Sequence, residues 1–242
     1  MNQAGTRRRW EGDDAPPQRD WGELAWNFGR MLGTFRRRGP RGPKHGQPVL
    51  VIPGFLSSDQ TTFSLRRELA RQGFRVHGWK QGFNLGARPD TIETLGERID
   101  SLGHDQPIVI VGWSLGGVFG REFARYHPDR VKAVITLGSP FSGDPHQNNV
   151  WKLYEWVAKH PVDDPPVPRI TDKPPVPHLA IWSRRDGMIA PRAARGLDHE
   201  RDKAVELTCH HMAFAISPSA ARQVVREIRT FLEEYGLAES RH

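Results

Sequence analysis

Short apolar runs recur along the chain from residue 48 onward, and most are followed by a longer segment with helical spacing. Six runs have the length and composition of buried strands: 49–52, 75–79, 108–111, 133–137, 178–182 and 204–207. Strands joined through helices run parallel, and a parallel sheet is covered by helices on both faces. The alternation therefore predicts the α/β class, with a mostly parallel, doubly wound sheet of about six strands flanked by helices.

Helical spacing and end signals place the helices between these runs. The predicted helices span 61–74, 91–103, 115–127, 151–160 and 217–236. The last is the most sharply delimited, because Ser217 takes the N-cap, Pro218 the first turn and Gly236 the position beyond the end. Asp90 is expected to cap the helix that begins after it.

A proline-rich stretch interrupts the alternation between residues 139 and 177. Proline lacks the backbone N–H that helices and central strands use, so little regular structure is expected there. We predict a small lid insertion at about 141–176. One face of its single helix carries Trp151, Tyr154, Trp156 and Val157. This face lies either over a pocket or against the body of the protein.

The N-terminal part of the chain differs in composition from the rest. Residues 21–38 have apolar side chains at helical spacing and a basic end, which predicts an amphipathic helix. This helix packs either on the body of the protein or on a membrane surface. The predicted organisation is a basic arm and linker at 1–46, a globular domain at 47–236 and a tail at 237–242.

The formal net charge of the 242 residues is +7, and the sequence pI is about 10.0. Much of the excess lies at Arg7–Arg9 and Arg36–Arg38, and no nucleic-acid-binding module accompanies it, so no nucleic-acid partner is expected. A single cysteine, Cys209, excludes an intramolecular disulfide. Without a secretory signal or a long apolar stretch, a cytoplasmic location is expected, with peripheral membrane contact through residues 21–38 as the alternative.

The hexapeptide GWSLGG at 112–117 lies between the run at 108–111 and the helix predicted after it. A G-x-S-x-G sequence between a strand and a helix is typical of a sharp turn that exposes a nucleophilic serine. Gly112 and Gly116 occupy positions where side chains would collide in such a turn. The context predicts that Ser114 is a catalytic nucleophile.

A serine hydroxyl needs a base to take its proton, usually a histidine oriented by a carboxylate. Asp186 follows the run at 178–182, and His210 and His211 follow the run at 204–207. The order Ser, Asp, His matches that of sheets wound in this way. Two alternatives are an acid at Asp144 and a role for Asp186 as an ordinary Asp-Gly turn residue.

The segments VLVIPGF, GWSLGG, ITLGSPF, WSRRDGMI and HHMAFAISP, in this order, resemble the α/β-hydrolase superfamily, in particular bacterial lipase- and esterase-like serine hydrolases. The resemblance covers about residues 47–236. It favours His211 over His210, because the catalytic histidine of such proteins lies a fixed short distance before the Ser-Pro that opens the last helix. It also implies that the N–H groups of Phe55 and Leu115 form the oxyanion hole.

The resemblance implies hydrolysis of small-molecule or lipidic carboxylic esters through an acyl-enzyme on Ser114, without cofactor or metal. Acyl transfer by the same triad and a non-enzymatic, membrane-associated role are the alternatives. The histidines other than His210 and His211 are interpreted as surface or loop residues. A zinc site is the alternative for one cluster, which comprises Asp198, His199, His210 and His211.

Overall fold

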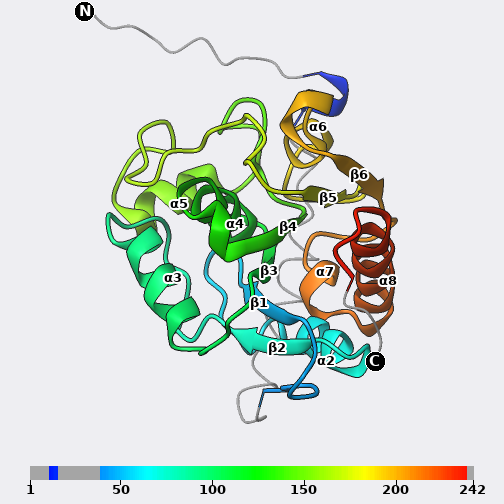
Figure 1. The fold of residues 1–242 in the computed structure, drawn as a ribbon. Coiled ribbons are helices and arrows are strands. Elements are labelled where there is room, and N and C mark those ends of the chain that lie inside the picture. The colour runs from blue at the N-terminus through cyan, green and yellow to red at the C-terminus, as the bar shows by residue number, and fades with distance from the viewer. Residues whose placement is uncertain (1–10, 16–38, 239–242) are drawn as a thin grey trace, which may run out of the picture.

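The computed structural model describes residues 11–15 and 39–238. Within these ranges six strands form one sheet in the order β2-β1-β3-β4-β5-β6, and every neighbouring pair runs parallel (Figure 1). The strands are β1 Pro48–Ile52, β2 Arg75–Gly78, β3 Ile108–Trp113, β4 Val131–Leu137, β5 His178–Trp182 and β6 Lys203–Glu206. The predicted parallel sheet flanked by helices is confirmed.

Alternate side chains of the strands pack against opposite layers of helices. Val49 and Val51 of β1 join the apolar cluster formed with α2 and α8, whereas Leu50 and Ile52 join the cluster formed with α3 and α4. Figure 1 shows these two layers on opposite sides of the sheet. The helices are α2 Phe63–Arg71, α3 Thr91–Asp100, α4 Leu115–Tyr126 and α8 Pro218–Glu234. Burial on both faces explains why the central strands are mostly apolar.

The ends of the helices follow the predicted signals with one exception. Ser217 Oγ accepts a hydrogen bond from the N–H of Ala220 at 3.4 Å, and Gly236 has φ of +64° beyond the end of α8. Asp90 precedes α3, but its side chain makes no capping bond. Asp90 therefore takes the predicted N-cap position, but its carboxylate accepts from Arg88 Nε at 3.1 Å and caps no backbone N–H.

Several short helical elements were not predicted. They are α6 Pro191–Arg195, α7 Ala213–Ile216 and the 3-10 turns η1 Gly12–Asp14, η2 Pro128–Arg130 and η3 Asp198–Glu200. None exceeds five residues, so none is long enough to show a helical period in the sequence. Two of them flank the loops that carry the predicted acid and base.

The insertion at residues 141–176 contains one helix, α5 Trp151–Ala158. Arg169 ties the later part of the insertion to its start, because its guanidinium donates to the carbonyl oxygens of Pro140, Ser142 and Gly143 at 3.2, 3.1 and 2.6 Å. A long stretch without regular structure is thereby held by side-chain contacts.

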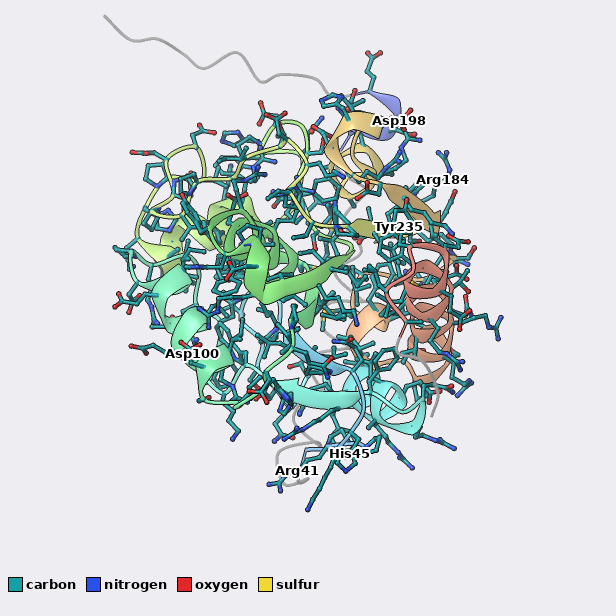
Figure 2. All side chains as sticks on the ribbon, viewed as in Figure 1. Arg41, His45, Asp100, Arg184, Asp198 and Tyr235 are labelled. Atoms are coloured by element: carbon teal, nitrogen blue, oxygen red, sulfur yellow. The ribbon has the colours of Figure 1, made fainter. Side chains whose placement is uncertain are left out.

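Residues 11–15 contact the domain near its β6 edge. Asp13 accepts from Arg184 at 2.9 Å, and Asp14 accepts from Gln147 Nε2 at 3.1 Å. Figure 2 labels Arg184 beside β6. The helix predicted at 21–38 lies outside the described residues and stays a prediction. Among the helices of the described ranges, none combines the length and apolarity needed to cross a bilayer.

Candidate active site

Ser114 lies at the sharp turn between β3 and α4. Its φ and ψ are 54° and −125°, a conformation that a residue with a side chain rarely adopts. A Cβ on Gly112 would come within 2.3 Å of Gly117 Cα, and one on Gly116 within 2.4 Å of the carbonyl oxygen of Ile52. These contacts explain the glycines on either side of the serine. The turn has the strained geometry that raises a serine above the end of a sheet.

Asp186 follows β5 in a tight turn and is 1% exposed. Its Oδ1 accepts from the N–H groups of Met188 and Ile189, each at 2.9 Å. Its Oδ2 lies 2.7 Å from Nδ1 of His211. The residue therefore bonds to the turn with one oxygen and contacts the imidazole with the other.

His211 is 2% exposed and is fixed on two sides. Its ring lies 5.5 Å from the ring of Trp113, whose Nε1 donates to the carbonyl oxygen of His211 at 3.2 Å. Trp113 immediately precedes Ser114, so this contact anchors the histidine loop beside the serine turn. In the neutral tautomer that donates Nδ1–H to Asp186, Nε2 is an acceptor. His210, in contrast, is exposed.

The alternative acid, Asp144, is engaged elsewhere. Its Oδ1 accepts from the N–H of His146 at 2.8 Å and lies 2.9 Å from Nδ1 of the same residue. The pair belongs to the insertion. Of the two candidate acids, the structure brings Asp186 to His211.

Gly138 is a site residue that the sequence analysis missed. It has φ of +53°, and a Cβ on it would lie 2.8 Å from Asp186 Oδ2 and 3.2 Å from His211 Nδ1. A larger residue would push the acid and the base apart. The only sequence signal is its position directly after β4, at the same end of the sheet.

The N–H groups of Phe55 and Leu115 both lie at the serine turn. Leu115 is the first residue of α4, where N–H groups lack helical partners and the helix dipole favours negative charge. Phe55 follows Gly54, and a Cβ on Gly54 would lie 2.9 Å from Ser114 Cβ. Among residues 11–15 and 39–238, no hydrogen bond occupies either N–H group. Both donors are available to a ligand.

A pocket of about 80 Å³ opens at Ser114. Trp151 and Tyr154 of α5 form part of its wall, whereas Trp156 on the same helix is 69% exposed. Most other lining residues are apolar, among them Phe55, Leu115, Val118, Phe119, Val167 and Ile189. The insertion thus covers the serine with one face of its helix.

The interpretation of the remaining histidines as surface or loop residues is wrong for His178. It lies in β5 with no exposed surface, its Nδ1 2.7 Å from Arg121 and its Nε2 3.1 Å from Thr136 Oγ1. Because arginine only donates, Nδ1 accepts and Nε2–H donates to the threonine. Burial, followed by the charge of Arg121, lowers the pKa of His178 well below its ordinary value, so the ring is neutral.

Arg121 links the helix behind Ser114 to the end of the insertion. It projects from α4 and donates to the carbonyl oxygens of Thr171 and Asp172 at 2.7 and 2.8 Å, and to that of Glu200 at 2.9 Å. Burial lowers the pKa of Arg121 to about 10, which still leaves it charged at neutral pH. The buried cation is compensated by backbone oxygens, as such a charge requires.

Within the described part of the chain, no three His, Cys, Asp or Glu side chains are arranged to hold a metal ion. The four residues of the zinc alternative, Asp198, His199, His210 and His211, are not brought together in such a group.

A family model described as the alpha/beta hydrolase fold matches residues 47–208, about two thirds of the chain. The chain belongs to this family. The strand order and the serine turn described above fit that assignment.

The curated relative Pimeloyl-[acyl-carrier protein] methyl ester esterase from Salmonella heidelberg is 29% identical over 96 residues. That match covers 38% of this chain and 36% of the relative, so it spans about a third of the relative's length.

Similar solved structures include carboxylesterase CesB from Bacillus subtilis, with a TM-score of 0.57 and 15% identity over 87% of this chain and 97% of that one. A thermophilic esterase from Thermogutta terrifontis has a TM-score of 0.57 and 19% identity over 79% and 92% of the two chains. At these identities the similarity shows the fold.

Proposed function

We propose that this chain hydrolyses carboxylic esters through an acyl-enzyme on Ser114. The observation that carries the proposal is the buried 2.7 Å contact between His211 Nδ1 and Asp186 Oδ2, beside a serine in a strained turn. Such a pair leaves Nε2 as a base for a serine hydroxyl. The esterase names of the relative and of the similar structures support the same reaction class.

In this mechanism Ser114 Oγ attacks the ester carbonyl while His211 Nε2 takes the hydroxyl proton. Asp186 holds the ring and stabilises the imidazolium that forms. The N–H groups of Phe55 and Leu115 donate to the oxyanion. Collapse of the tetrahedral intermediate breaks the ester C–O bond, and His211 gives its proton to the departing alcohol. Water, activated by the same histidine, then releases the acid and restores the serine.

The pocket supports a short acyl group as the preferred substrate. Its volume of about 80 Å³ is roughly half of the ~150 Å³ that accommodates benzene in an engineered cavity. Because most of the lining is apolar, burial of an aliphatic chain is favourable there. We expect acetate and butyrate esters to be turned over faster than long-chain esters.

Replacement of the nucleophile tests the proposal directly. We expect Ser114→Ala to lower the turnover of p-nitrophenyl butyrate by roughly three orders of magnitude or more, because the covalent step is lost. Ser101→Ala, at an exposed serine after α3, is the control and should match the wild type. Labelling with a fluorophosphonate, followed by peptide mapping, should find the adduct on Ser114. Equal turnover in the wild type and Ser114→Ala would refute the mechanism.

A further inference from the structure

The loop that carries Phe55 is held by a buried residue from another loop. Asn84, between β2 and α3, has no exposed surface. Its backbone N–H donates to the carbonyl oxygen of Ser57 at 2.8 Å, and its own carbonyl oxygen accepts from the N–H of Leu56 at 2.7 Å. Its side-chain Nδ2 donates to the carbonyl oxygen of Pro53 at 2.8 Å. One residue therefore bonds to the chain on both sides of Phe55.

The loop needs such support because its backbone is strained. Leu56 has φ of +55°, a left-handed conformation that is costly for a residue with a branched side chain. Ser57 Oγ adds an internal bond to the carbonyl oxygen of Gly54 at 2.6 Å. The side chain of Asn84 is itself fixed, since its Oδ1 accepts from the N–H of Gly86 at 3.2 Å. Its Nδ2 group is thereby aimed at the loop.

We infer that Asn84 is the positioning residue for the Phe55 oxyanion donor, an inference that rests on the proposed ester hydrolysis. Asn84 does not line the pocket at Ser114, so it acts through the loop and not on the substrate. An oxyanion donor lowers the barrier only when it is fixed in advance at the position where charge develops. The bond from Nδ2 to Pro53 restrains the backbone two residues before Phe55.

Asn84→Asp is the sharpest test, because it keeps the size of the side chain and leaves both backbone bonds available. An ionised carboxylate would face the Pro53 carbonyl oxygen, and two acceptors repel each other. We expect kcat for p-nitrophenyl butyrate to fall about tenfold to hundredfold while KM changes less than about twofold, as for a weakened oxyanion donor. Fluorophosphonate labelling of Ser114 should slow by a similar factor.

The pH dependence of the variant separates positioning from simple damage. A neutral carboxyl group carries an O–H that can donate to Pro53, and burial raises the pKa of a carboxyl group. The ratio of variant to wild-type kcat should therefore rise as the pH falls from 8 to 6. Asn84→Ala, which has no group to protonate, should show the loss in kcat without this pH dependence.

Gln47→Glu is the matched control. Gln47 is also buried, and its Nε2 donates to a proline carbonyl, that of Pro107, at 3.1 Å. It precedes β1 at the opposite end of the sheet from Ser114, so kcat should stay within about twofold of the wild type. Thermal unfolding of each variant shows that it is folded.

Either of two results on the Asn84 variants would overturn the inference alone. If Asn84→Ala retains wild-type kcat, or if the loss in Asn84→Asp appears only as a raised KM, Asn84 does not position the donor. Absence of Ser114-dependent turnover in the wild type would overturn the proposed function together with the inference. Normal wild-type turnover with unaffected Asn84 variants would overturn the inference alone.

Discussion

Asp186 is the residue whose role can be tested most directly, because the chain offers a second acid for comparison. We predict that Asp186→Asn lowers kcat by about three to four orders of magnitude. The asparagine amide would donate to His211 Nδ1, which would place the ring proton on Nε2 and block its action as a base. The turn should survive, since the amide oxygen can still accept from the N–H groups of Met188 and Ile189. Steady-state turnover of p-nitrophenyl butyrate measures the effect.

Asp144→Asn is the control for this prediction. Asp144 bonds to His146 and is the other acid that the sequence allowed. Its replacement should change kcat less than about threefold, since it does not contact His211. The reverse pattern, with a large loss at Asp144 and a small one at Asp186, would assign the acid to the insertion.

At the residue scale, the sequence was informative where a side chain follows a strand end. Ser114, Asp186 and the pair His210 and His211 are predicted from their positions after apolar runs, and the resemblance to α/β-hydrolases favours His211. Asn84 and Gly138 cannot be predicted in this way, because their contacts are with segments distant in the sequence. The burial of His178 is hidden in the sequence for a similar reason, since the buried arginine that accompanies it comes from another element.

At the scale of elements, α5 is expected to set the length of the acyl group. Trp151 and Tyr154 line the pocket, and the ring of Trp151 is held 4.8 Å from that of His146. We predict that Trp151→Ala raises the ratio of kcat/KM for p-nitrophenyl octanoate over the butyrate about tenfold, because the removed indole leaves room for about two more methylene groups, each contributing ~0.8 kcal/mol of burial. A series of esters from acetate to decanoate measures the preference.

Trp156→Ala provides the matched control on the same helix. The indole of Trp156 is 69% exposed, so its removal should leave the chain-length profile unchanged. An identical profile in the wild type and Trp151→Ala would show that α5 does not limit the acyl site.

The predictability of the elements follows from their length and packing. The sheet and the long helices could be predicted because their residues repeat with a regular period, and α8 carries its end signals in the sequence. The path of the insertion could not, since prolines and loops have no period. Its position depends on single contacts such as those of Arg169 and Arg121. The helix at 21–38 stays a prediction from periodicity.

At the scale of the whole molecule, the buried His178 links folding stability to pH. Burial lowers its pKa in the folded protein well below the ~6.5 of an unfolded chain, so the unfolded state binds a proton first as the pH falls. Stability should therefore be lost below about pH 6.5, at up to ~1.4 kcal/mol per pH unit from this residue. We predict that His178→Gln, which keeps an acceptor and a donor, unfolds with a shallower pH dependence between pH 6.5 and 5 in urea titrations.

His199→Gln is the appropriate control, because it makes the same substitution at an exposed histidine. Other groups contribute to the wild-type slope. Burial and neighbouring cations lower the pKa of His77 to about 4, and burial raises the pKa of Glu122, an effect of opposite sign. His77 is distant from His178, so its contribution to the pH dependence of stability is the same in the wild type and in His178→Gln and cancels between them. Glu122 adjoins Arg121, which bonds to His178. The quantity to compare is therefore the difference in slope between the two proteins. Equal slopes in the wild type and His178→Gln would mean that His178 takes up its proton without unfolding, and that the bond from Arg121 does not hold the ring neutral.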